Sequence, residues 1–94
     1  MKTKTRRWDV VEHLETDQDM VAYLDAALET GDAALIAVTL GDIVRARGLG
    51  EISRQTGVGR AGLNRALSPD GKAEFATILK VVRALRLKLH ASAT

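Results

Sequence analysis

The sequence predicts an all-α protein, a small helical bundle that contains a helix-turn-helix in its second half. Its 94 residues are enough for one hydrophobic core but not for two. Apolar residues recur at spacings of three and four in residues 16–30, 33–47 and 73–87, which is the period of an amphipathic helix. Gly57 separates two shorter helical patterns within residues 49–67. We expect a flexible basic tail at residues 1–7, followed by one domain over residues 8–94.

The N-terminal tail is basic and has no acidic residue. Its cations fit either an arm that reaches along DNA or a solvated tail, and they are Lys2, Lys4, Arg6 and Arg7. Trp8 is expected to anchor the tail on the core. Residues 9–14 predict a short helix with Val10, Val11 and Leu14 on one face. His13 has no second ligand at a suitable spacing, so it is expected at the surface.

The first long helix is predicted to begin after Thr16, whose hydroxyl can accept from the free N–H groups of the first turn. Asp17 and Asp19 then lie at the positive end of the helix dipole. Gly31 is the expected C-terminal stop. The stripe predicted to be buried consists of Met20, Val21, Leu24, Ala27 and Leu28.

The next helix is predicted over residues 33–47, with Asp32 as its N-cap and Gly48 as its end. Gly41 inside it predicts close packing against another helix, because glycine otherwise costs about 1 kcal/mol relative to alanine. Arg45 and Arg47 complement the C-terminal dipole. The side chains predicted to be buried are Leu35, Ile36, Thr39, Leu40, Ile43 and Val44.

Residues 49–67 predict the helix-turn-helix. Gly57 accepts the positive φ of the turn, Ser53 is small enough for the second helix to cross it, and Leu63 and Ala66 point into the core. The outward face of the second helix carries Gly59, Arg60, Ala61, Asn64 and Arg65. Arginine pairs well with guanine and asparagine with adenine, so this face has the chemistry of a major-groove reader. An ordinary helical hairpin explains the buried positions but not the exposed ones.

Residues 68–71, Ser-Pro-Asp-Gly, predict a reverse turn, and Lys72 follows it where it can contact a phosphate. A last helix is predicted from residue 73 to about residue 87, and its buried stripe consists of Phe75, Ile78, Leu79, Val82 and Leu85. Residues 87–90 alternate apolar and polar, which predicts a short terminal β-strand that needs a pairing partner.

The charges are unevenly distributed along the chain. Residues 9–44 hold nine acidic residues and no Lys or Arg, whereas ten basic residues and three acidic ones follow from Arg45 onward. The basic half is expected to attract phosphate and the acidic half to be repelled by it. The acids fit either a surface for a basic partner or a solvated face.

Several classes of function are disfavoured by the composition. The chain has no cysteine, two isolated histidines and no glycine-rich phosphate loop after a strand, so we expect no cofactor, no metal site and no enzyme activity. No apolar run approaches the roughly 20 residues of a membrane span, and the basic start lacks the pattern of a signal peptide. The expected location is the cytoplasm.

The motifs GVGRAGLNRALS, PDG and EFATILKVVRALRLKLH, preceded by MVAYLDAALETGDAALIAVTLGDIVRARG, resemble the HigA-type addiction module antidote branch of the Xre/Cro-like helix-turn-helix proteins. The resemblance covers almost the whole chain from Trp8 and implies a lambda-repressor/Cro-like fold. In that family the recognition helix commonly opens with serine, whereas Gly59 stands at that position here.

The resemblance implies a cytoplasmic antitoxin of a type II toxin–antitoxin module. Such antitoxins form homodimers, bind operator DNA to repress their own operon, and neutralise a RelE/ParE-like toxin. The residues that the family places on DNA correspond to Gly59, Arg60, Ala61, Asn64 and Arg65, and Lys72 is added as a phosphate contact. Because such toxins are generally basic, the expected toxin-binding residues are Glu12, Glu15, Asp17 and Asp19. A stand-alone Cro-like repressor without a toxin, and an interaction module that has lost DNA binding, remain alternatives.

Overall fold

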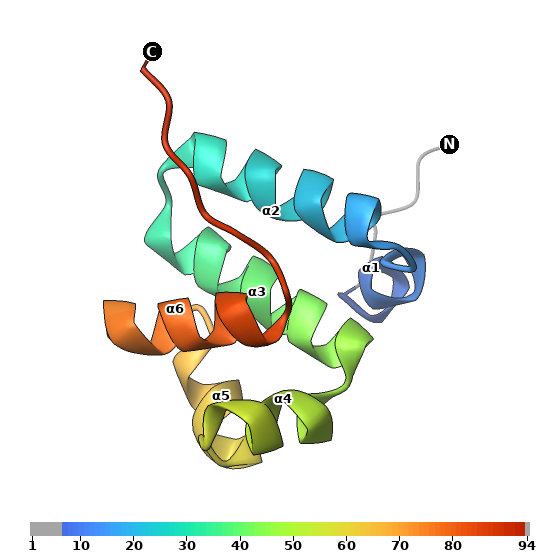
Figure 1. The fold of residues 1–94 in the computed structure, drawn as a ribbon, viewed down its shortest axis with the longest axis vertical. Helices are drawn as coiled ribbons and strands as arrows, with labels where there is room; N and C mark the ends of the chain where they lie inside the picture. The colour runs from blue at the N-terminus through green and yellow to red at the C-terminus, as the bar shows by residue number, and fades with distance from the viewer. Residues whose placement is uncertain (1–6, 94) are drawn as a thin grey trace.

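The computed structural model describes the backbone of residues 7–93 and the side chains from Val10 onward. This part of the chain folds into helices arranged around one core (Figure 1). They are α1 (Arg7–His13), α2 (Asp17–Thr30), α3 (Ala33–Arg47), α4 (Leu49–Thr56), α5 (Arg60–Ala66) and α6 (Phe75–Ala84). The prediction of an all-α bundle is confirmed. The predictions for the tail at residues 1–6 and for the Trp8 side chain lie outside the described residues.

The helix ends of the acidic half follow the predicted caps. Thr16 and Asp19 form a reciprocal capping box at the start of α2, and Gly31 ends that helix in the left-handed conformation with φ 69°. The carboxylate of Asp32 accepts from the N–H groups of Ala34 and Leu35 and so begins α3. These local signals explain why α2 and α3 begin and end where the sequence predicts.

Helix α3 is the centre of the fold and contacts each of the other five helices described. Every residue of its middle, 37–44, is buried. A Cβ built at Gly41 would lie 2.8 Å from the carbonyl oxygen of Leu67, so glycine is what allows the end of α5 to pack closely against α3. The predicted reason for Gly41 is therefore confirmed.

The prediction of a terminal strand at residues 87–90 is wrong. Among residues 7–93 no strand forms, and this segment runs as extended coil past α2 (Figure 1). Its neighbours there are helical side chains, and a strand without a neighbouring strand has no partner for its backbone groups.

The last helix is shorter than predicted and runs from Phe75 to Ala84. Glu74 is in the extended conformation just before it, and Arg86, with φ 65°, turns the chain away just after it. Some apolar side chains predicted to be buried are instead exposed, and these are Val21, Leu28, Leu35, Phe75 and Leu79. Helical spacing identifies the apolar face of a helix, but it does not show how much of that face the neighbouring helices cover.

Candidate nucleic-acid interface

Helices α4 and α5 meet at a glycine turn that side-chain hydrogen bonds hold in place. Gly57, with φ 77°, ends α4, and its N–H donates to the carbonyl of Ser53. The Ser53 hydroxyl donates to the carbonyl of Val58 at 2.6 Å. Thr56 Oγ1 accepts from the N–H of Val58 at 3.2 Å. The Ser53 hydroxyl therefore ties α4 to the backbone just before α5, a bond that the sequence reasoning did not predict.

The inner side of α5 is fixed in the core. Leu63 and Leu67 are buried, as is Ile52 of α4. The turn after α5 also packs tightly, because a Cβ built at Gly71 would lie 2.3 Å from the carbonyl oxygen of Arg65. Helix α5 is therefore held rigidly along one side and at its C-terminal end.

The six residues predicted to face DNA are all exposed, and they are Gly59, Arg60, Ala61, Asn64, Arg65 and Lys72. Arg65 and Lys72 line the same shallow surface hollow, so the turn places the lysine beside α5. The guanidinium of Arg60 lies over Gly50 at the start of α4, where a Cβ would approach its Nη2 to 2.7 Å. These side chains form one exposed polar surface around α5, which we call the α5 face.

The α5 face includes a residue that the sequence reasoning missed. Arg45, at the end of α3, donates from Nη1 to Asn64 Oδ1 at 3.4 Å and from Nη2 to Asp42 Oδ1 at 3.2 Å. Asp42 is buried and also accepts from the Tyr23 hydroxyl at 2.6 Å. The i,i+3 spacing of Asp42 and Arg45 was a signal for their pairing, but nothing in the sequence places Arg45 beside Asn64.

The acidic residue of α4 is neutralised locally. The Glu51 carboxylate accepts from the side chains of Gln55 and Arg54. The bond from Gln55, followed by that from Arg54, lowers the pKa of Glu51 below its ordinary value of 4.5. The acid therefore stays charged at neutral pH but has a cation beside it.

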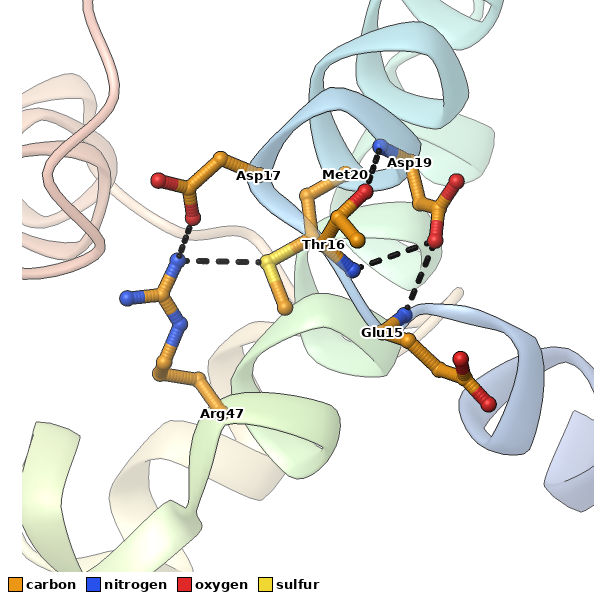
Figure 2. A network of polar contacts seen from close by, with 6 residues as sticks. All are labelled: Glu15, Thr16, Asp17, Asp19, Met20 and Arg47. Atoms are coloured by element: carbon orange, nitrogen blue, oxygen red, sulfur yellow. Dashed lines mark hydrogen bonds and ion pairs between the residues drawn. The ribbon is translucent and has the colours of Figure 1, made fainter.

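The four acids predicted to bind a toxin differ in their surroundings, and Figure 2 shows three of them, Glu15, Asp17 and Asp19. Asp19 accepts from the backbone N–H groups of Thr16 and Glu15, both at 3.1 Å, and these bonds lower its pKa below the ordinary value of 3.8. Asp17 accepts from Arg47 Nη2 at 2.7 Å. Glu12 and Glu15 have exposed side chains. Two of the four acids therefore also have a role in the fold. Their position in the first turn of α2 was predicted, but the bond between Asp17 and Arg47 was not.

A comparison with known protein families identifies the kind of protein. The sequence profile of the family described as "Probable addiction module antidote protein" matches residues 4–93. The chain belongs to this family. It is also 41% identical over 90 residues to an uncharacterized protein of Haemophilus influenzae (strain Rd), and the match covers 96% of this chain and 93% of that one. No solved structure matches the chain.

Membership of the antidote family indicates an antitoxin of an addiction module, and hence a toxin as partner in general. Among the residues that the structure describes, no group of three or more His, Cys, Asp or Glu side chains is arranged to hold a metal ion. No described helix is long and apolar enough to cross a membrane.

Proposed function

We propose that the protein is the antitoxin of a type II toxin–antitoxin module, that it binds operator DNA as a homodimer to repress its own operon, and that it neutralises a RelE/ParE-like toxin in the cytoplasm. Its family supports the antitoxin role. The observation that carries the DNA-binding role is the exposure of Arg60, Asn64 and Arg65 on a helix whose opposite side is fixed in the core by Leu63.

In this proposal α4 and α5 form a helix-turn-helix, and α5 is the recognition helix. A helix about 10–12 Å across fits the major groove, which is about 12 Å wide. The guanidinium groups of Arg60 and Arg65 can pair with guanine, and the amide of Asn64 can pair with adenine. Lys72, which shares a surface hollow with Arg65, supplies a phosphate contact. A twofold dimer would place two such helices about 34 Å apart, one helical turn of DNA.

The test is titration of a fluorescent duplex from the protein's own promoter region. R60A and N64A are expected to lose about 1–3 kcal/mol of specific binding each. K72A is expected to weaken all duplexes equally and to reduce the salt slope by about one unit. The matched control is K88A, which also removes one cation. Lys88 lies beside α2, and the segment after α6 runs past α2, away from α4 and α5 (Figure 1). Equal affinity of R60A, N64A and wild type would refute the assignment.

The toxin-binding part of the proposal rests on the charge of the first half of the chain. Glu12 and Glu15 are exposed at the end of α1 and just before α2, in a half without Lys or Arg from residue 9 to residue 44. A basic toxin would be attracted to this surface. Because Asp17 and Asp19 also stabilise the fold, we propose that Glu12 and Glu15 supply the part of this surface that can be tested without perturbing α2.

This part is tested by co-purification with a RelE/ParE-like toxin from the same operon. E15K is expected to weaken the complex, and more so at low salt, because the reversed charge repels a basic surface. The control is E29K, an exposed glutamate on α2 with the same change of charge. If E12K/E15K and wild type bind the toxin equally, the electrostatic surface is wrong. If the operon encodes no such toxin, the result favours the alternative function, a stand-alone repressor without a toxin.

A further inference from the structure

Arg45, at the end of α3, is held in position although part of its side chain faces water. Its Nη2 donates to Oδ1 of Asp42 at 3.2 Å, and the other oxygen of that carboxylate accepts from the Tyr23 hydroxyl at 2.6 Å. Asp42 itself is fully buried. The same Nη2 lies close over Gly41, where a Cβ would approach it to 3.2 Å. The guanidinium is therefore fixed on the surface of α3.

The position of Arg45 decides which way round the Asn64 amide lies. Nη1 of Arg45 donates to Asn64 Oδ1 at 3.4 Å, and both side chains line one surface hollow between α3 and the turn after α5. Arginine has N–H donors and no acceptor, so the amide atom that faces it must be the oxygen. Turning the amide by half a turn would replace this hydrogen bond with two N–H groups that point at each other. The NH₂ group of Asn64 therefore lies on the side of the amide away from Arg45.

The orientation of the amide matters for reading a base pair. In the major groove adenine presents an acceptor, N7, and a donor, the N6 amino group, and N7 lies nearer the backbone of adenine's own strand. Asparagine pairs with both when its NH₂ group donates to N7 and its oxygen accepts from N6. The oxygen has two lone pairs, so Asn64 Oδ1 can accept from Arg45 and from adenine together. If the pair is reversed to T·A, the same NH₂ group meets the thymine methyl group instead of N7.

We propose that Arg45 is a positioning residue that makes Asn64 distinguish an A·T pair from a T·A pair, with the adenine on the strand that lies away from Arg45. This inference rests on the proposed function, because it requires α5 to enter the major groove. An asparagine whose amide is free to turn would accept either orientation of the pair. Arg45 of α3 thus acts on the base pair through Asn64 of α5.

The experiment is titration of the full chain against fluorescent duplexes from its own promoter region, in which each A·T pair of the footprinted site is reversed, one pair at a time. Reversing the pair that Asn64 reads is expected to cost wild type about tenfold in affinity. N64A identifies that pair, because it should bind the original and the reversed duplex equally. R45M has a side chain of similar length without a donor, so it should also bind these two duplexes about equally.

The quantity compared is the ratio of two affinities of the same protein. A change in the folded fraction, or in the general attraction to phosphate, alters both affinities alike and cancels from this ratio. The matched control is R47M, the same substitution in the same turn of α3, because the guanidinium of Arg47 bonds to Asp17 and Met20 of α2 instead. Its ratio is expected to equal that of wild type.

The outcomes separate this inference from the proposed function. If R45M keeps the wild-type ratio, whether or not it weakens both duplexes, the inference is overturned while specific DNA binding stands. If N64A keeps the wild-type ratio at every pair, Asn64 does not read adenine, and the inference fails together with that assignment. If wild type binds the promoter duplex no more tightly than an unrelated duplex, the DNA-binding proposal itself fails and the inference falls with it.

Discussion

The N-terminus of α5 has no capping side chain. We test the effect of adding one by comparing G59S with G59A, two variants that differ by a single hydroxyl group. Gly59 is the N-cap, its backbone is extended with φ −62° and ψ 157°, and no side chain caps the helix. A Cβ built at Gly59 meets nothing within 4 Å, so a larger residue fits without moving its neighbours. In G59S the serine oxygen can accept from a free N–H group of the first turn, and in G59A it cannot.

The expected magnitude follows from the value of a serine cap. Serine is worth about 1 kcal/mol more than alanine at this position. For a domain of this size that difference corresponds to about 4–8 °C in melting temperature. G59A should stay within about 0.5 kcal/mol of wild type, because the smaller entropy of its unfolded chain offsets the poorer cap.

Thermal denaturation followed by circular dichroism measures the free energy of unfolding of the three proteins. If the start of α5 also lies against a phosphate, titration of the promoter duplex should then show tighter binding for G59S than for G59A, because the serine hydroxyl can donate to the phosphate. Equal stability of G59S and G59A would refute the description of this helix end. If G59S is more stable than G59A but binds DNA no better, the phosphates of the duplex lie away from the start of α5.

Three further predictions concern the packing around the α5 face and the acidic half. G71A should destabilise the fold by about 1–3 kcal/mol in chemical denaturation, because its Cβ would lie 2.3 Å from a backbone carbonyl oxygen that cannot move freely. L63A should cost about 2–5 kcal/mol by the same measurement, since Leu63 is fully buried and ties α5 to the core. D19A should lower the melting temperature at neutral pH but not in acid. The pKa of Asp19 is lowered in the folded state, so its contribution is present above its ordinary pKa of 3.8 and is lost as the pH falls below that value. A constant difference between D19A and wild type from neutral pH into acid would contradict this role.

The sequence predicted the helices well because their ends are set by local chemistry. Thr16 with Asp19, Gly31, Asp32 and Gly57 each act within a few residues of the chain, so a reader of the sequence can find them. The same is true of the exposed positions on α5, because Leu63 fixes which side of a short helix is buried. The misplaced helices are the first, which was predicted over residues 9–14 and is found at Arg7–His13, and the last, which begins at Phe75 and ends at Ala84.

The features that the sequence could not predict depend on contacts between segments that are distant along the chain. Arg45 reaches Asn64 across 19 positions, and Arg47 reaches Asp17 across 30, so no local pattern reveals either pair. The exposure of Phe75 also depends on segments that are distant along the chain. Its spacing matches a buried stripe, but whether a neighbour covers it depends on where α2 and the C-terminal segment lie. For the same reason the strand predicted at residues 87–90 could not be excluded beforehand.

The last turn of α3 joins the two oppositely charged halves of the chain. Arg47 pairs with Asp17 at the start of α2, and Arg45, held by the buried Asp42, bonds to Asn64 on the α5 face. Because Asn64 Oδ1 accepts from Arg45, its amide can turn less freely than that of an isolated surface asparagine. The Tyr23 hydroxyl of α2 donates to the same Asp42 carboxylate, so a continuous path of side chains runs from the acidic half to the proposed base-reading residue. Helix α2 and the residue that we propose to read adenine are thus joined through Asp42 and Arg45.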